Sequence, residues 1–168
     1  MKVVLYMAMS ANGMIAKSND NTSWISETEW NSYSATVRNA GCLIVGRRTY
    51  HILTKQLEFA ELKDVKLVAV SKEKLSTVSP NHLVASSPKE ALEMLKDFDT
   101  VIVAGGGILN TSFLEQELVD ELYLDIEPIV LGKGIKLFSD SDFETKLELL
   151  ETKQLSPNEI QLHYKVVK

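Results

Sequence analysis

Residues 100–114 read Thr-Val-Ile-Val-Ala-Gly-Gly-Gly-Ile-Leu-Asn-Thr-Ser-Phe-Leu, with three consecutive glycines at the end of an apolar run. The continuous apolar run 101–104 is typical of a strand buried on both faces of a parallel sheet. Apolar residues then recur at helical spacing, so Gly105, Gly106 and Gly107 mark a strand-to-helix turn. A backbone without Cβ atoms can approach a ligand closely there. The free N–H groups at the start of the helix favour an anion, most often a phosphate.

The same alternation of strands and helices extends along the chain. Strands are expected at 2–9, 42–45, 65–70, 82–85, 100–104 and 121–126. Helices are expected between them at 27–39, 47–53, 88–96 and 107–114. Near the end, two strand-like segments at 146–154 and 160–167 flank the turn residues 156–159. The pattern predicts one three-layer α/β domain over residues 1–168, with a mostly parallel sheet and a C-terminal antiparallel hairpin.

The composition argues against several classes of protein. With 168 residues, 45% of them hydrophobic and 24% charged, the chain can bury a core without disulfides or metal. The net charge of −5 argues against nucleic-acid binding by a global field. No run approaches the ~18 apolar residues of a membrane span, and the apolar run after Lys2 is too short for a signal peptide. We expect a cytoplasmic protein that binds neither nucleic acid nor membrane.

The cysteine and the histidines show no spacing typical of a catalytic or metal-binding site. Cys42 is the single cysteine, and its apolar neighbours indicate a buried, inert thiol rather than a catalytic one. The histidines, His51, His82 and His163, are scattered and lack the spacing of metal ligands. No metal site is expected.

Two more expected strand ends carry groups that suit an anion. The strand 42–45 is followed by Gly46, Arg47, Arg48 and Thr49. A tight turn, a helix start, two guanidinium groups and a hydroxyl all favour a phosphate. The strand 65–70 is followed by Ser71 and Lys72, which supply a hydroxyl and an ammonium group. Three strand ends therefore have anion-friendly groups.

Together these three ends predict a dinucleotide site. Ligands of open α/β sheets bind beyond the carboxyl ends of the strands, and a pyrophosphate plus a 2′-phosphate would use three such places. Arg and Lys at these ends favour NADPH over NADH. Each motif alone could equally be a solvated first turn or a plain turn. The chain has neither Gly-x-Gly-x-x-Gly nor a Walker lysine, so an ordinary Rossmann fingerprint and a P-loop are excluded.

The motifs, taken in order, resemble the dihydrofolate reductase superfamily. The nearest likeness is to its bacterial and archaeal dihydrofolate reductase-like branch, which shares a fold with the reductase domain of riboflavin biosynthesis. The similar strings lie at 6–16, 45–50, 103–107, 118–123 and 128–138. The resemblance implies a fold of eight strands, NADPH as cofactor, a small-molecule substrate and a homodimer, for which the C-terminal strands are the candidate contact.

The resemblance also implies roles for the residues that match. The nicotinamide pocket would be lined by Ala8, Ile15 and Ala16. The phosphates would be held by Gly46, Arg47, Arg48 and Thr49, and the 2′-phosphate side of the adenosine by Ser71 and Lys72. The pyrophosphate and nicotinamide would be covered by Gly105, Gly106, Gly107, Ile108 and Leu109.

Trp24 and Glu29 are the candidates for substrate binding and catalysis. Folate-reducing members have an acid five positions after a tryptophan, and this acid contacts the pterin ring; Glu29 has that spacing from Trp24. A buried carboxylate could hydrogen-bond an aminopyrimidine edge and help to deliver a proton. Glu29 also lies three residues after Ser26, the spacing of a capping box, so it could equally cap a helix. Asp125 is implied as a second polar contact to the substrate, or it could face solvent.

Three departures from the family leave the substrate open. Asn12 stands before Gly13 where the family has an acid, and residues 62–68 contain no arginine for a folate carboxylate. Residues 52–59 lack the proline of the substrate loop in the riboflavin-pathway reductase. The expected function is an NADPH-dependent reductase of a pterin or of a pyrimidine such as 5-amino-6-(5-phosphoribosylamino)uracil. The alternative is an NADPH-binding module without turnover.

Overall fold

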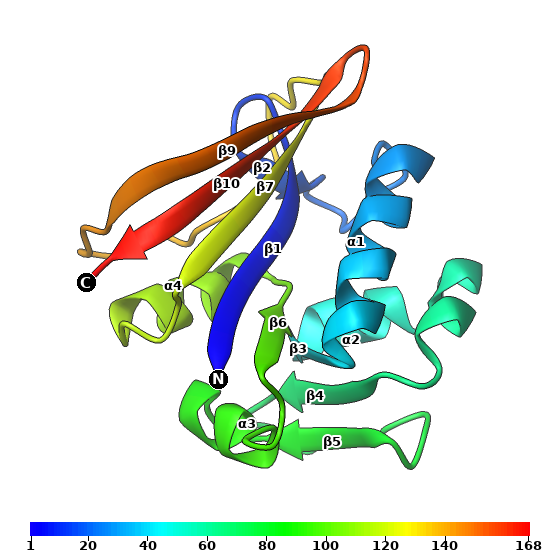
Figure 1. Cartoon of the computed structure of the whole chain (residues 1–168). Helices are drawn as coiled ribbons and strands as arrows, with labels where there is room; N and C mark the ends of the chain where they lie inside the picture. Colours follow the sequence, from blue (N-terminus) through cyan, green and yellow to red (C-terminus); the bar gives the residue numbers. More distant parts are fainter.

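The centre of the computed structural model, which describes residues 1–168, is an eight-stranded sheet with the order β5-β4-β3-β6-β1-β7-β10-β9 (Figure 1). Its strands are β1 (Lys2–Ser10), β3 (Cys42–Gly46), β4 (Lys66–Val70), β5 (His82–Ala85), β6 (Thr100–Val103), β7 (Glu121–Glu127), β9 (Lys146–Ser156) and β10 (Glu159–Val167). Strands β5 to β7 of this order run parallel, whereas β10 pairs antiparallel with both β7 and β9. The expected mostly parallel sheet with a C-terminal hairpin is confirmed.

Helices cover the two faces of the sheet. One hydrophobic cluster joins the sheet to α1 (Glu27–Ala40) and α2 (Arg47–Leu53), and the other joins it to α3 (Pro88–Met94) and α4 (Gly107–Glu115). Within β3, Leu43 and Val45 belong to the first cluster and Ile44 to the second. Because both faces are buried, the central strands read as continuous apolar runs.

Three short elements were not expected from the sequence. Strands β2 (Met14–Ala16) and β8 (Ile135–Lys136) pair antiparallel in a separate small sheet, and η1 (Leu57–Leu62) is a 3-10 helix. Strands of two or three residues are too short to show periodicity, so long-range pairing alone defines them. All the other elements begin and end within two residues of their expected bounds, as for α3, which ends at Met94 rather than at 96.

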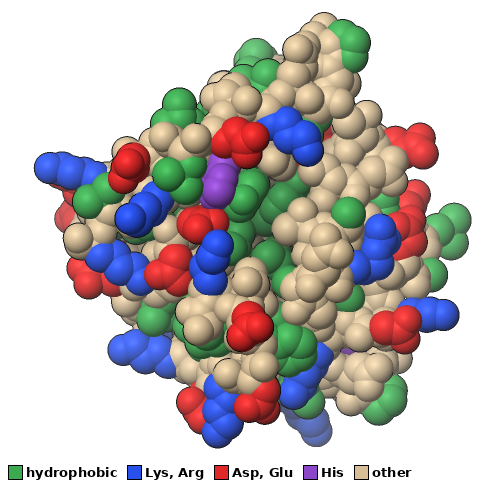
Figure 2. Space-filling view, in the orientation of Figure 1, with side chains coloured by type: hydrophobic (Ala, Val, Ile, Leu, Met, Phe, Trp, Pro, Cys, Tyr) green, Lys and Arg blue, Asp and Glu red, His purple; other side chains and the backbone are tan.

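Charged side chains of both signs are interspersed over the face shown in Figure 2. Cys42 is buried, and burial raises the pKa of its thiol to about 11, which agrees with an inert cysteine. None of the helices has the length and apolar character needed to cross a membrane.

Candidate functional site

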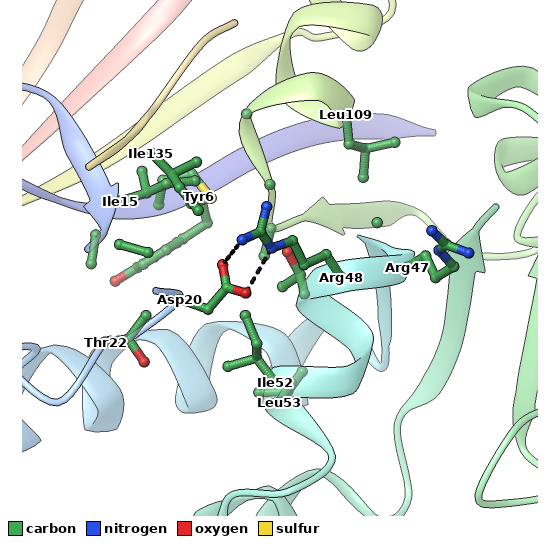
Figure 3. Close-up of a pocket in the computed structure, with 18 of the residues that line it drawn as sticks. Tyr6, Ile15, Asp20, Thr22, Arg47, Arg48, Ile52, Leu53, Leu109 and Ile135 are labelled. Carbon is green, nitrogen blue, oxygen red and sulfur yellow. Dashed lines mark hydrogen bonds and ion pairs between the residues drawn. The ribbon is translucent and has the colours of Figure 1, made fainter. Parts of the chain in front are cut away.

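A cleft of about 1590 Å³ opens beyond the carboxyl ends of the parallel strands. It lies between residues of β1 and α1 on one side and the ends of β3, β4 and β6 on the other. Figure 3 shows Ile15 and Ile135 on one wall, with Arg47 and Arg48 of α2 and Leu109 of α4 farther along. This is the position at which open α/β sheets bind ligands.

Most of the residues expected in the site line this cleft. They are Ala8, Ile15, Ala16, Glu29, Gly46, Arg47, Arg48, Thr49, Ser71, Lys72, Gly106, Gly107, Ile108 and Leu109. Three others do not line it, namely Trp24, Gly105 and Asp125. The fold therefore gathers segments that are far apart in the sequence, and the three exceptions have other surroundings.

The two glycine-containing turns are joined directly. The Gly46 N–H donates a hydrogen bond to the Gly105 carbonyl oxygen (2.7 Å), and the Ala104 N–H donates to the Ile44 carbonyl oxygen (2.9 Å). Gly105 has a left-handed φ of +82°, and a Cβ atom there would lie 3.1 Å from the Met7 Cε. Gly105 thus links the two turns through backbone geometry, and it does not line the cleft.

Gly107 is required for packing between elements. A Cβ atom at Gly107 would collide with the carbonyl oxygen of Lys136 in β8. At Gly106, by contrast, the nearest atom to a Cβ would be Thr49 Oγ1 at 3.5 Å, which is ordinary contact. Of the three glycines, Gly106 and Gly107 line the cleft, and Gly107 also lets the small sheet approach α4.

Both arginines at the start of α2 are paired with carboxylates. Arg48 Nε lies 2.7 Å from Asp20 Oδ2 and Arg48 Nη2 lies 2.6 Å from Asp20 Oδ1, as the dashed lines in Figure 3 show. Arg47 forms an ion pair with Glu73. Neither acid was predicted from the sequence. Glu73 lies two residues after Ser71, so its position in the predicted anion-binding loop was a usable signal. Asp20 and Arg48 are far apart in the sequence, and no local pattern indicates that they pair.

Glu29 is buried, with 5% of its surface exposed, and lines the cleft. Its backbone N–H donates to Ser26 Oγ (3.0 Å), which confirms Ser26 as the N-cap of α1. In a complete capping box the Glu29 side chain would also accept a hydrogen bond from the Ser26 N–H. Here the Ser26 N–H donates to Glu127 Oε1 instead (2.9 Å), so the capping box is incomplete. The Glu29 carboxyl group makes no hydrogen bond within the protein, so it is available to a ligand.

The environment of Glu29 favours its protonated form. Burial raises its pKa well above the usual value, and the nearby carboxylates of Asp125, Glu127 and Glu159 raise it further. The last two interact closely at the ends of β7 and β10. Burial raises the pKa of Glu127, whereas for Glu159 hydrogen bonds outweigh the effect of burial and lower it.

Asp125 lies behind the wall of the cleft. Only 1% of its surface is exposed, which excludes the alternative that it faces solvent. Its carboxylate accepts hydrogen bonds from the Tyr6 hydroxyl (2.6 Å) and from Gln161 Nε2 (2.8 Å). Burial raises its pKa to about 6, despite those two hydrogen bonds. Tyr6 itself lines the cleft, so Asp125 borders the site through Tyr6.

Trp24 lies away from the cleft wall, on the segment that precedes α1. Its indole Nε1 donates to the Asn21 carbonyl oxygen (3.2 Å). The tryptophan that lines the cleft is Trp30, whose Nε1 donates to Glu61 Oε1 (3.3 Å). Of the pair Trp24 and Glu29 that the spacing singled out, only Glu29 lines the cleft. No group of three or more His, Cys, Asp or Glu side chains has a geometry that could hold a metal ion.

The sheet order and the position of the cleft belong to a dihydrofolate reductase-like fold, a class of α/β protein whose solved members superpose on this chain. The family model of the RibD C-terminal domain matches residues 1–161, and the chain belongs to this family.

Individual relatives agree with this assignment. The chain is 32% identical to the protein YwjB of Bacillus subtilis over 173 residues, with 97% of each chain covered. It is 34% identical to dihydrofolate reductase type 1 of Escherichia coli over 132 residues, which cover 76% of this chain and 78% of the reductase. Dihydrofolate reductase from Enterococcus faecalis, solved with NADP(H) and RAB-propyl, superposes with a TM-score of 0.77 at 14% identity, covering 99% and 97% of the chains. The last likeness concerns the fold.

Proposed function

We propose that the protein is an NADPH-dependent reductase that reduces a C=N or C=O bond in a pterin- or pyrimidine-type small molecule. The observation that carries the proposal is the chemistry of the cleft at its two ends. One end has arginine, serine and glycine groups that suit phosphates, and the other has the buried, unpartnered carboxyl group of Glu29. A reductase needs both a dinucleotide site and a polar anchor beside the reacting bond.

The residues of the cleft fit a phosphorylated dinucleotide. Arg47 and Arg48 would hold phosphates by charge-assisted hydrogen bonds, exchanging their present carboxylate partners, the exposed Glu73 and the partly buried Asp20, for the anion. The Thr49 hydroxyl lies near Gly106, where the backbone leaves room for a ligand. Ala8, Ile15 and Ala16 would form the apolar surface for the nicotinamide ring. When bound, NADPH supplies the hydride.

Glu29 would anchor the substrate and move the proton. A protonated carboxyl group has one donor and one acceptor, which match the adjacent N–H and ring nitrogen of an aminopyrimidine. Its raised pKa keeps it protonated at pH values at which an exposed glutamate is ionised. Tyr6, held by Asp125, would close the wall beside it and exclude water.

The direct test is turnover by the purified protein. Dihydrofolate and 5-amino-6-(5-phosphoribosylamino)uracil are each mixed with NADPH, and the loss of reduced-nicotinamide absorbance is followed. Enzyme-dependent loss with either substrate supports the proposal, and the faster one names the substrate class. Absence of any thermal shift or calorimetric binding with NADPH would contradict it.

A second candidate is a module that binds NADPH without turnover on these substrates. It is favoured by one observation: residues 62–68 include no arginine that could pair with a folate carboxylate. NADPH binding with no consumption across folates, pterins and pyrimidine ribitol phosphates would favour it.

We also propose that the chain works as a homodimer through β9 and β10, whose outer surfaces expose Leu147, Leu149 and Ile160.

A further inference from the structure

One end of the cleft has an acidic side chain among cationic ones. Glu73, just after β4, lines the cleft together with Ser71, Lys72 and Arg47. In the sheet order β4-β3-β6-β1, these residues are at the outer edge of the dinucleotide cleft. Glu29 interacts instead with Asp125 on β7, beyond β1. A dinucleotide that directs its reactive ring toward Glu29 would therefore have its other end, the adenosine ribose, beside Glu73.

The backbone around Glu73 is held in place. Ser71 Oγ donates a hydrogen bond to the Glu73 carbonyl oxygen (2.8 Å) and accepts one from the Glu73 N–H (3.2 Å). The backbone of Glu73 is thus held in place, and its carboxylate pairs with the Arg47 guanidinium. The side chain of Glu73 is 70% exposed and that of Arg47 is 43% exposed, so both can reorient when a ligand enters.

We propose that Glu73 is a specificity-determining residue that weakens the preference of the cleft for NADPH and lets it accept NADH. The inference rests on the proposed dinucleotide function. A guanidinium group at the adenosine ribose suits a 2′-phosphate, whereas a carboxylate accepts a hydrogen bond from a 2′-hydroxyl and repels a phosphate. Arg47 and Glu73 place both groups at one position, and Glu73 competes with a 2′-phosphate for Arg47.

The other arginine provides a contrast. Arg48 pairs with Asp20, which precedes α1, and next to Arg48 in sequence is Thr49, whose hydroxyl lies near Gly106 in the middle of the cleft. A pyrophosphate there is common to NADPH and NADH. The Asp20 carboxylate therefore affects both dinucleotides alike, and of the two carboxylates Glu73 is the one that discriminates between them.

The experiment measures the dissociation constants of NADPH and NADH by calorimetry for the wild-type protein and for Glu73→Gln. The same titrations use adenosine 2′,5′-bisphosphate and AMP, which differ only in the 2′-phosphate. The matched control is Glu93→Gln: Glu93 is also an exposed, ion-paired glutamate, with 72% of its side chain exposed, and it lies outside the cleft.

Glu73→Gln should bind NADPH and the bisphosphate about three- to fivefold more tightly, the upper part of the range expected for removing one exposed opposing charge. Affinities for NADH and AMP should change by less than about twofold, because Gln keeps an acceptor oxygen. Glu93→Gln should leave all four unchanged. Equal tightening of both dinucleotides, or no change for NADPH, would overturn the inference while leaving the proposed function intact. A wild-type protein that binds neither dinucleotide would overturn both.

Discussion

At the scale of single residues, Glu29 combines burial, a place in the wall of the cleft and a carboxyl group without a hydrogen-bonding partner. Glu127, by contrast, accepts a hydrogen bond from the Ser26 N–H, and Glu61 pairs with Arg38. A carboxyl group in the position of Glu29 must either stay protonated or be satisfied by a ligand, because an unpaired buried charge is costly. Its role can therefore be tested through both rate and pH.

Glu29→Gln should lower kcat by about a hundredfold or more, the usual contribution of a general acid. Since the pKa of Glu29 is raised, the wild-type rate should fall as the pH rises through that pKa and the acid loses its proton. The variant should lack this limb of the pH profile and should keep its affinity for NADPH. A full wild-type rate in Glu29→Gln would leave Glu29 with a structural role only.

Arg47→Ala tests the other end of the cleft. If Arg47 meets the 2′-phosphate, the variant should lose about tenfold or more in NADPH affinity, as expected for a charge-assisted hydrogen bond, and much less in NADH affinity. Calorimetric titration of both dinucleotides measures the difference. Equal losses would reassign Arg47 to the pyrophosphate.

At the scale of elements, the cleft depends on how closely α4 approaches the small sheet formed by β2 and β8. Gly107 begins α4, and its missing Cβ is the space that the Lys136 carbonyl occupies. The adjacent Asn110 side chain donates to the Leu137 carbonyl oxygen (2.9 Å), which holds the same segment against the helix. The small sheet thus fixes one wall of the cleft, including Ile15 and Ile135.

Gly107→Ala should lower the free energy of unfolding by about 1–3 kcal/mol, because the added methyl group forces the β8 backbone away from α4. Urea denaturation measures the change. Gly132→Ala is the matched control, since a Cβ atom there would have no neighbour within 4 Å. Similar stabilities for the two variants would mean that the contact relaxes without cost.

At the scale of the whole molecule, the C-terminal hairpin leaves apolar surface uncovered. Strand β9 is the edge of the sheet, and its first nine residues are all exposed. Leu149 is 54% exposed and Leu147 is 40% exposed, and long apolar edge strands normally pair or are covered. These observations support association of two copies through this edge.

Light scattering should give twice the chain mass of 18.8 kDa for the wild-type protein. Leu149→Lys should give the monomer mass, because it places a charge within the apolar contact. Leu57→Lys is the control: Leu57 is 91% exposed but lies in η1, outside the C-terminal hairpin. A monomeric wild-type protein would contradict the proposed dimer.

The sequence by itself determined the order of the main strands and helices, the three strand ends that line the cleft and the Ser26 cap, because each is a local pattern of a few residues. The partners and the burial of the side chains at these places depend on the tertiary structure. Glu127, distant in sequence, binds the Ser26 N–H and so frees Glu29. Asp20 and Glu73 similarly pair with arginines distant in sequence. Burial, pairing and pKa depend on neighbours that the fold brings together, and no local pattern contains them.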